Sequence, residues 1–409
     1  MARIVDVRAR RVWDSRGRAT VEAEVILKGA RGRAIAPAGA STGAGEAKSV
    51  DAAQAVRNVN GPIRQALLGV DARFQDAVDA KLVALDGTPD KSRFGANAIV
   101  AVSLACLHAS AAAAKKPLWR HLAGERRVAM PVPQIQIYGG GAHAAGRVDL
   151  QDYMVTCPGA GSFAESLDWI AEVYHAAGAR LAKKGARAGV ADEGGWWPAF
   201  KSNEEGLAEL VGANSDAGFE PGADVAIALD IAASQFHRGG SYHLALENRS
   251  LSADQLHAML LRWLDAYPIV SVEDPFAEQD HEAMRAFTKA AGARVQIVGD
   301  DLFVTSAARL DPALANCVLL KPNQVGTVSE TLACWNAAKD KGMRAIVSAR
   351  SGETEDVSIV HLAVGWGVSQ LKVGSFSRSE RMAKWNEGLR IEEALGGKQL
   401  LYPARKLFK

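Results

Sequence analysis

Short runs of alternating apolar and polar residues open the chain. Ile4–Val12, Thr20–Leu27 and Arg33–Ala36 are rich in residues that favour β-strands. The turn signals Ser15-Arg16-Gly17 and Lys28-Gly29 separate the first runs from one another. Strand-like runs joined by such short turns are typical of hairpins. The pattern therefore predicts a small antiparallel meander.

The hydrophobic spacing then changes to that of helices. Apolar residues recur three and four positions apart in Ala52–Leu68, Ala72–Leu85 and Ala96–Ala114. Strands followed by helices are typical of an α+β unit. The prolines of Met130-Pro131-Val132-Pro133 favour extended chain and interrupt the helical pattern. We therefore expect an α+β domain over residues 1–130.

A second pattern fills residues 131–409, where apolar runs alternate with amphipathic helical stretches. The runs are Val225–Leu229, Ile269–Val272, Gln296–Val298, Cys317–Leu320, Arg344–Val347 and Gln370–Val373. Strands that alternate with helices indicate repeated βα units and a parallel sheet. The length of this part is close to the ~250 residues typical of a TIM barrel. We therefore expect an α/β barrel here.

Charged residues stand where these predicted strands end. Asp230, Glu273 and Asp300 come just after three of the runs. Lys321 comes just after a later run, and Lys372 lies near the end of the last one. The carboxyl ends of barrel strands meet at one mouth, where the active sites of barrels lie. An all-oxygen set of ligands suits a hard cation such as Mg²⁺. A cation that faces a lysine can acidify a C–H bond beside a carboxylate, so the pattern predicts proton abstraction.

Composition narrows the classes of partner. The 48 Lys and Arg residues nearly balance the 46 Asp and Glu residues, and the formal net charge of +2 excludes a globally basic nucleic-acid-binding protein. The four cysteines have no paired spacing, so neither a zinc site nor a disulfide framework is expected. The N-terminus has no apolar leader, and the alanine-rich stretch Gly95–Ala114 predicts a buried helix. We expect a cytoplasmic protein that binds neither nucleic acid nor membranes.

A series of motifs resembles the enolase (phosphopyruvate hydratase) family over nearly the full length of the chain. In chain order the motifs are Asp14-Ser15-Arg16-Gly17, Gly39-Ala40-Ser41-Thr42-Gly43, Gly95-Ala96-Asn97-Ala98-Ile99, Asp192-Glu193-Gly194-Gly195, Ser271-Val272-Glu273-Asp274-Pro275-Phe276, Gly299-Asp300-Asp301-Leu302, Ser351-Gly352-Glu353-Thr354-Glu355-Asp356 and Arg378-Ser379-Glu380-Arg381. The resemblance implies a modified (β/α)₈ TIM barrel with an N-terminal α+β capping domain. It also implies a homo-oligomer, either a dimer or an octamer.

The resemblance assigns the strand-end carboxylates to a metal. Asp230, Glu273 and Asp300 would hold one Mg²⁺. A second Mg²⁺ would arrive with the substrate, aided by the loop that contains Ser41. As is known for the enolase superfamily, a lysine or histidine base works there with one or two Mg²⁺ ions. The ions stabilise the charge that develops on the substrate carboxylate.

The resemblance also implies roles for the remaining site residues. Lys321 would be the base at C2, with its pKa lowered by burial and by nearby metal charge. Glu193 would act as the general acid for the hydroxide that leaves C3. The substrate-binding set would be Lys372 for the carboxylate, Arg350 and Ser351 for the phosphate, and His143, Asp152 and Ser41.

Several positions depart from the family pattern, mainly on the phosphate and leaving-group side. The departures are Ala349 and Gly45 in place of histidines, Ala38 in place of a serine, Asp152 in place of a glutamate, Gly139 and Ala142 in place of an asparagine and a serine, and Trp196-Trp197 in place of Phe-Ala. Loss of polar groups from an anion site weakens binding unless the ligand changes too. The two indoles are expected either to contact the substrate or to form a lid packed against the capping domain.

These features leave several functions open. The first is a Mg²⁺-dependent lyase that removes the proton alpha to a carboxylate and eliminates water, as enolase does with 2-phosphoglycerate in glycolysis. The second is a paralogue that dehydrates a phosphonate or phosphinate analogue, as in carboxyphosphonoenolpyruvate formation. The third is a non-catalytic, enolase-derived binding protein. A further function, that of a dehydratase or racemase acting on unphosphorylated acids, is disfavoured by Arg350 and Ser351, which the resemblance assigns to a phosphate. The expected partner is therefore a small anionic carboxylate that carries a phosphate or phosphonate group.

Overall fold

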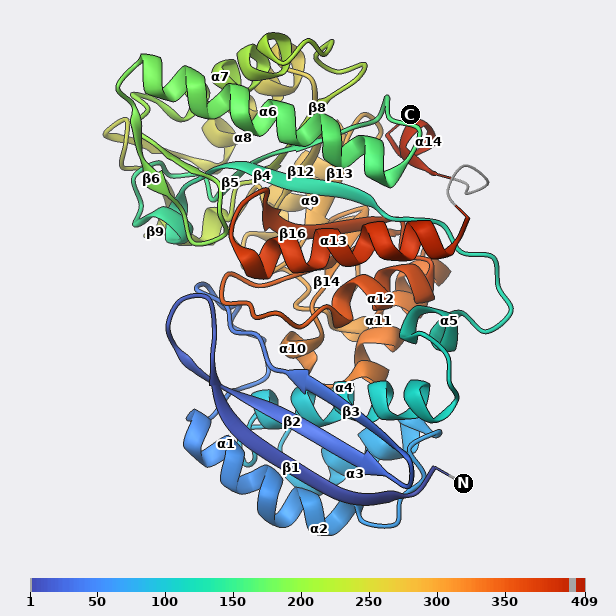
Figure 1. Cartoon of the computed structure of the whole chain (residues 1–409). Helices are drawn as coiled ribbons and strands as arrows, with labels where there is room; N and C mark the ends of the chain where they lie inside the picture. Colours follow the sequence, from blue (N-terminus) through green and yellow to red (C-terminus); the bar gives the residue numbers. More distant parts are fainter. Residues whose placement is uncertain (1, 397–401, 409) are drawn as a thin grey trace.

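The N-terminal part of the chain contains a three-stranded sheet. The structure, a computed structural model, describes residues 2–396 and 402–408. Strands β1 (Ile4–Trp13), β2 (Ala19–Leu27) and β3 (Ala30–Ile35) pair antiparallel in chain order. The predicted meander is confirmed. In Figure 1 this sheet lies at the bottom, below a larger barrel.

Several helices follow this sheet in the chain. They are α1 (Ala52–Asn58), the π-helical segment η1 (Val59–Ile63), α2 (Arg64–Leu67), α3 (Gln75–Asp86), α4 (Ala96–Ala113) and α5 (Leu118–Ala123). The single helix expected over Ala52–Leu68 is interrupted by the π-helical turn, which contains Pro62. Proline has no backbone N–H to donate, so the regular helical ladder breaks there. The next predicted helix begins at Gln75 rather than at Ala72.

The alanine-rich helix α4 forms the centre of the N-terminal part. Nearly all of its side chains are buried. It approaches β3 so closely that a Cβ atom on Gly32 would overlap the backbone of Ala105 and Ala109. Among the described residues, α4 is the one helix long and apolar enough to cross a membrane, and 78% of that apolar window is buried inside the protein.

Eight strands close into a barrel above this part. They are β4 (Val132–Gly139), β5 (Asp152–Thr156), β8 (Ala226–Asp230), β12 (Ile269–Glu273), β13 (Gln296–Gly299), β14 (Cys317–Leu320), β15 (Arg344–Ser348) and β16 (Gln370–Ser375). Pairing of β16 with β4 closes the ring. All six apolar runs identified in the sequence are barrel strands. The barrel fold and its N-terminal cap agree with the expectation.

One barrel strand runs against the others, which the expected repeat of parallel units did not foresee. β5 pairs antiparallel with both β4 and β8. Parallel neighbours need a crossover, usually a helix, whereas β4 and β5 are joined by a loop with only the short 3₁₀ helix η2 (Gly141–Ala144). The reversal places the first residue of β5, Asp152, opposite the last residue of β8, Asp230.

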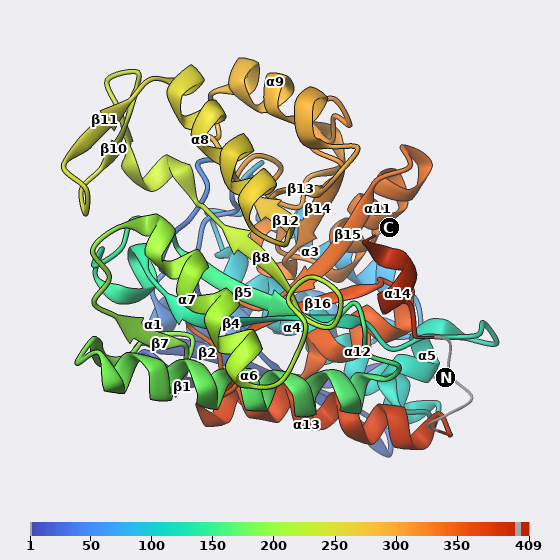
Figure 2. The ribbon, with the colours of Figure 1, turned by 90° about the horizontal axis from the view of Figure 1, so that it is seen from above.

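Helices surround the barrel, as Figure 2 shows. They are α6 (Phe163–Lys183), α7 (Asn203–Asp216), α8 (Ala253–Ala266), α9 (His281–Ala291), α10 (Pro322–Val325), α11 (Val328–Asp340), α12 (Ser358–Trp366), α13 (Ser379–Ala394) and α14 (Ala404–Leu407), with short 3₁₀ segments η3 (Ala233–Phe236) and η4 (Ala307–Arg309). The hairpin β6 (Arg187–Val190) and β7 (Trp196–Pro198) extends the sheet beyond β4, and β9 (His237–Arg238), β10 (Ser241–Leu244) and β11 (Arg249–Leu251) form a small separate sheet.

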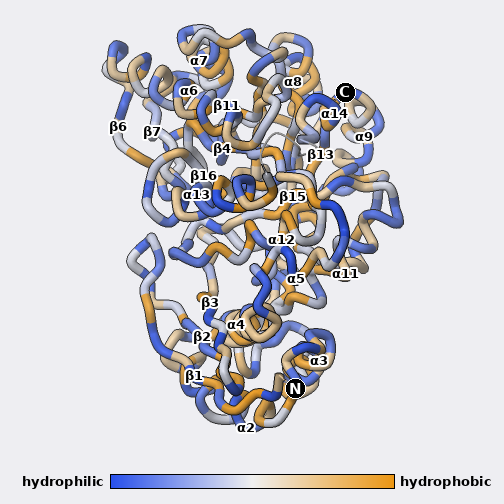
Figure 3. Tube along the Cα trace, turned by 45° about the vertical axis from the view of Figure 1, so that its right-hand side comes forward, coloured by the Kyte–Doolittle hydropathy of each residue, from blue (hydrophilic) through white to orange (hydrophobic). Residues whose placement is uncertain are grey.

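Figure 3 shows hydrophobic segments in both parts of the chain. The four cysteines are buried and free.

Replacement of Gly32 by alanine tests the contact between β3 and α4. The new methyl group would overlap helix backbone, which cannot rotate away as a side chain can. We expect Gly32→Ala to lower the free energy of unfolding by about 3 kcal/mol, measured by denaturant titration. Gly61→Ala is the control, because a Cβ atom there meets nothing within 4 Å. Equal stability of the two variants would contradict this packing.

Candidate active site

A small cavity lies at the mouth of the barrel, where the loop around Ser41 meets the strand ends. Its lining includes the predicted residues Ser41, His143, Glu193, Asp230, Lys321, Arg350, Ser351 and Lys372. The predicted residues Asp152, Glu273 and Asp300 do not line it, but they contact its histidine and its lysines. The structure therefore brings the whole predicted set together from both parts of the chain.

Lys372 joins carboxylates from two neighbouring strands. Its Nζ atom lies 2.8 Å from Asp230 Oδ2 and 2.8 Å from Glu273 Oε2. Burial disfavours the ammonium group, but the two carboxylates outweigh burial and raise the pKa of Lys372 well above its usual value. Burial and the charge of Asp230 likewise raise the pKa of Glu273. Lys372 thus neutralises negative charge of the carboxylates that are buried at the ends of β8 and β12.

Lys321 stands at the end of β14 and is hydrogen-bonded to Asp300 Oδ2. Burial lowers the pKa of Lys321, but the charge of Asp300 raises it more, so the pKa lies above its usual value. The lowering expected from the sequence includes the charge of a bound metal, whereas here the Asp300 carboxylate contacts the ammonium group directly. A lysine held in this way keeps its proton until Asp300 has another partner.

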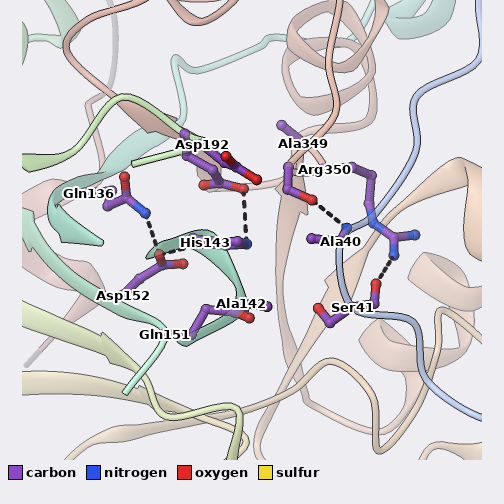
Figure 4. A network of polar contacts seen from close by, with 12 residues as sticks. Ala40, Ser41, Gln136, Ala142, His143, Gln151, Asp152, Asp192, Ala349 and Arg350 are labelled. Atoms are coloured by element: carbon purple, nitrogen blue, oxygen red, sulfur yellow. Dashed lines mark hydrogen bonds and ion pairs between the residues drawn. The ribbon is translucent and has the colours of Figure 1, made fainter. Parts of the chain in front are cut away.

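His143 connects two carboxylates on the other side of the cavity (Figure 4). Its Nδ1 atom lies 2.9 Å from Asp152 Oδ1, and its Nε2 atom lies 3.7 Å from Glu193 Oε1. Burial lowers the pKa of His143, but Asp152 and Glu193 raise it to about 9. Burial raises the pKa of Asp152, whereas the imidazolium brings it below its usual range. His143 is therefore protonated at neutral pH.

The arginine expected on the phosphate side is held by a residue of the N-terminal part. Arg350 Nη1 lies 2.9 Å from Glu46 Oε2, and Nη2 lies 3.0 Å from Glu46 Oε1. Nη2 also donates to the Ser41 carbonyl at 3.0 Å, and the Ser351 hydroxyl accepts from Ala40 N (Figure 4). These contacts dock the glycine-rich loop on the barrel. This loop comprises residues 38–45. Glu46 was missed in the sequence analysis, because its one signal in the sequence is its position directly after the loop.

Two glycines of this loop make room for arginine side chains. A Cβ atom on Gly39 would overlap the guanidinium of Arg350, and one on Gly45 would overlap that of Arg309. The space of the histidine expected at position 45 is therefore taken by Arg309. Ala349 differs, because it lines the cavity itself and offers only a methyl group there.

The two tryptophans near Glu193 are not among the residues that line the cavity. Trp196 stacks on Tyr174 with ring centroids 4.8 Å apart and donates to the Tyr174 carbonyl at 2.8 Å. It therefore packs on α6 of the barrel rather than forming a lid against the N-terminal part. The Tyr174 hydroxyl donates to Gly194 O at 3.1 Å, so this stack supports the turn that carries Glu193.

Carboxylate oxygens at the mouth offer ligands for a hard cation. Among the described residues, two groups have ligand atoms within 4.8 Å of one another, namely His143, Asp152 and Glu193, and Asp274, Asp300 and Asp301. The predicted set is not such a group, because Lys372 stands between Asp230 and Glu273. Glu273 Oε1 is nevertheless buried without a hydrogen-bond partner, an orphaned oxygen that a cation would satisfy. The all-oxygen donor set fits Mg²⁺, with Lys372 as the group to be displaced.

Two buried glutamines of the site were also missed. Gln151 lines the cavity and donates to Asp230 Oδ2 at 2.9 Å. Gln136 donates to Asp152 Oδ1 and accepts a hydrogen bond from Gly195 N. A single glutamine carries no chemical signature in a sequence, so only the fold identifies these two.

Comparison with known proteins yields matches over almost the whole chain. The family model for the enolase N-terminal domain matches residues 4–122, and the one for the enolase C-terminal TIM barrel domain matches residues 127–409. "Enolase 1" from Desulfitobacterium hafniense (strain Y51) is 45% identical over 424 aligned residues, which cover 99% of this chain and 97% of that relative.

Removal of Glu46 tests the contact between the loop and the barrel. Glu46→Ala would leave the Arg350 guanidinium buried and unpaired, so we expect the free energy of unfolding to fall by about 3–5 kcal/mol. The control is Glu204→Ala, because Glu204 makes an equally forked pair with Arg262 at 2.8 Å on the surface. Exposed pairs contribute only about 0–1 kcal/mol. Similar losses in the two variants, measured by denaturant titration, would contradict the account.

The pH dependence of stability tests the charge on His143. A histidine whose pKa is raised from about 6.5 to about 9 on folding stabilises the fold below the lower value, and this stabilisation is lost as pH rises through the higher one. Relative to His143→Gln, the wild type should therefore lose about 3 kcal/mol of unfolding free energy over this pH range. Denaturant titration at several pH values checks this. A difference that is constant with pH would contradict protonation of His143.

Proposed function

The chain belongs to the enolase family, and on that premise we propose that it converts 2-phosphoglycerate to phosphoenolpyruvate and water with Mg²⁺. It is a hydro-lyase, so the non-catalytic binding protein considered above is set aside. The reaction removes a proton alpha to a carboxylate and then expels a hydroxide from the neighbouring carbon. It needs a base, an acid and positive charge around one small anion.

One observation carries the proposal: Lys321 and Glu193 line the same small cavity. Lys321 comes from the end of β14 and Glu193 from the turn between β6 and β7, so the two approach the cavity from different elements. Lys321 would take the proton from C2, and Glu193 would protonate the hydroxide that leaves C3. Lys321 acts as a base only in the state in which Asp300 has another partner.

Cationic groups surround the place of the substrate. Lys372 would bind its carboxylate, whereas Arg350 and Ser351 would bind its phosphate. Because Glu46 and the Ser41 carbonyl already fix the guanidinium of Arg350, little side-chain entropy is lost when an anion binds. The remaining members of the substrate-binding set are Ser41, His143 and Asp152.

The metal would be held by the carboxylates of three successive strands, Asp230, Glu273 and Asp300. Mg²⁺ bound there would stabilise the second negative charge that the substrate carboxylate acquires when the C2 proton leaves. A second Mg²⁺ would come with the substrate. The surplus of carboxylates over lysines in this region supports the assignment, since buried like charges need a counter-ion.

A phosphonate or phosphinate analogue of 2-phosphoglycerate is a second candidate substrate, because of Ala349. Its methyl group lines the cavity where the family pattern has a histidine. One donor fewer on the phosphate side lowers the affinity for a phosphate and favours a ligand that does not need it.

Three further features belong to the proposal by analogy with the family. They are a location in the cytoplasm, assembly as a homodimer or octamer, and a domain boundary between residues 130 and 131. The last is supported by the position of the boundary in the connection between α5 and β4.

Turnover of 2-phosphoglycerate with Mg²⁺, followed by enolpyruvate absorbance, tests the proposal. We expect the wild type to react with a kcat of ~1–10³ s⁻¹, and Lys321→Ala and Glu193→Gln to lose about 10²- to 10⁴-fold. The control Lys289→Ala removes an exposed lysine of α9 and should leave the rate unchanged.

The same assay with a phosphonate analogue separates the two candidate substrates. Fast turnover of 2-phosphoglycerate excludes the specialised paralogue, whereas slow turnover of it beside fast turnover of the analogue supports that paralogue. A Lys321→Ala variant as active as the wild type would contradict the proposed reaction on either substrate.

A further inference from the structure

The carboxamide of Gln136 lies between two groups of the acid side. Gln136 is fully buried on β4. Its Nε2 atom donates to Asp152 Oδ1, which Figure 4 shows, and its Oε1 atom accepts from Gly195 N at 2.8 Å. Gly195 belongs to the turn that carries Glu193. One side chain thus contacts both the Asp152 carboxylate and the backbone that places Glu193.

These contacts close into a ring. Asp152 Oδ1 also accepts from His143 Nδ1 at 2.9 Å, and His143 Nε2 lies 3.7 Å from Glu193 Oε1. The path therefore runs from Gln136 through Asp152, His143 and Glu193 and returns through Gly195. Each member of such a network is held from two sides, so a shift of one member moves the others.

Two glycines leave the space that the carboxamide fills. A Cβ atom on Gly195 would overlap Gln136 Oε1 and stand 2.9 Å from its Cδ atom. A Cβ atom on Gly139 would stand 3.2 Å from Gln136 Nε2 and 2.5 Å from the Cβ atom of Ala191. A larger residue at position 139, such as the asparagine of the family pattern, would press on the carboxamide. The position of the Gln136 carboxamide therefore depends on glycine at position 139, where the family pattern has asparagine.

The short side chain at position 152 matches the same arrangement. Asp152 replaces a glutamate of the family pattern, which is one methylene longer. Its Oδ1 atom is already in hydrogen-bond contact with Gln136 Nε2 in a fully buried place. A longer side chain would drive its carboxylate into the carboxamide, and a packed interior resists that change. Gln136, Gly139 and Asp152 are thus matched to one another.

We propose that Gln136 is a positioning residue that keeps the Asp152 carboxylate and the Glu193 turn in their relative places. It allows this chain to use aspartate at position 152, where the family pattern has glutamate. The inference rests on the proposed function, because Glu193 is the general acid in that reaction.

A double-mutant cycle tests the match. Gln136→Asn shortens one partner by a methylene, and Asp152→Glu lengthens the other. We expect each single variant to lower kcat for 2-phosphoglycerate by about ten-fold or more with a smaller change in KM, whereas the double variant recovers to within about three-fold of the wild type. The unfolding free energy of each variant is measured beside kcat. Gln136→Met, which keeps the length but donates nothing, should lower kcat as Gln136→Asn does.

Gln134→Asn provides the matched control. Gln134 lies two residues earlier on β4, is equally buried and donates to Gln370 at 2.9 Å, far from Asp152 in the hydrogen-bond network. Combined with Asp152→Glu, it should give no recovery of kcat.

The outcomes separate the inference from the proposed function. Recovery of kcat in the Gln136→Asn/Asp152→Glu variant, without recovery in the control, supports the positioning role. Three results would each overturn that role and leave the proposed function standing. They are losses of kcat that add in the double variant, coupling that is seen in the unfolding free energy but not in kcat, and an Asp152→Glu variant as fast as the wild type. A wild type without turnover of 2-phosphoglycerate or its phosphonate analogue would overturn both.

Discussion

Buried charge at the barrel mouth is the constraint on which the rest of the site depends. Transfer of a carboxylate from water into the protein costs several kcal/mol unless a partner accompanies it. Lys372 therefore contacts both Asp230 and Glu273, and Lys321 contacts Asp300. The eight-stranded ring allows these contacts because it turns strands that are far apart in sequence toward one opening. The groups that neutralise one another are also those that the proposed reaction uses.

The N-terminal part completes this site rather than only covering it. Its glycine-rich loop supplies Glu46 and the Ser41 carbonyl to Arg350, and the barrel supplies the Ser351 hydroxyl to the loop in return. A buried forked ion pair has a high cost when either partner is lost. The loop and Arg350 are therefore fixed together. The cavity that results is lined by residues of both parts of the chain, most of them polar.

The sequence predicted the elements that local patterns determine, and missed those that depend on contacts distant in the chain. Apolar runs identified six barrel strands, and the charged residues at the ends of five of them identified the strand-end carboxylates and lysines. The antiparallel course of β5 was missed, because it follows from a loop without a crossover helix. The partners Glu46 and Gln136 were missed because a single polar residue has no pattern. The direct contact of Lys321 with Asp300 was not foreseen either, and it outweighs the effect of burial on the pKa of Lys321.

Exchange of the C2 proton of 2-phosphoglycerate with deuterium oxide, followed by proton nuclear magnetic resonance with Mg²⁺ present, tests the central claim most directly. It observes proton abstraction apart from loss of hydroxide. The account predicts that Glu193→Gln exchanges the proton while forming little phosphoenolpyruvate, and that Lys321→Ala exchanges none. Exchange by Lys321→Ala at the wild-type rate would contradict the assignment of the base and, with it, the account of the barrel mouth.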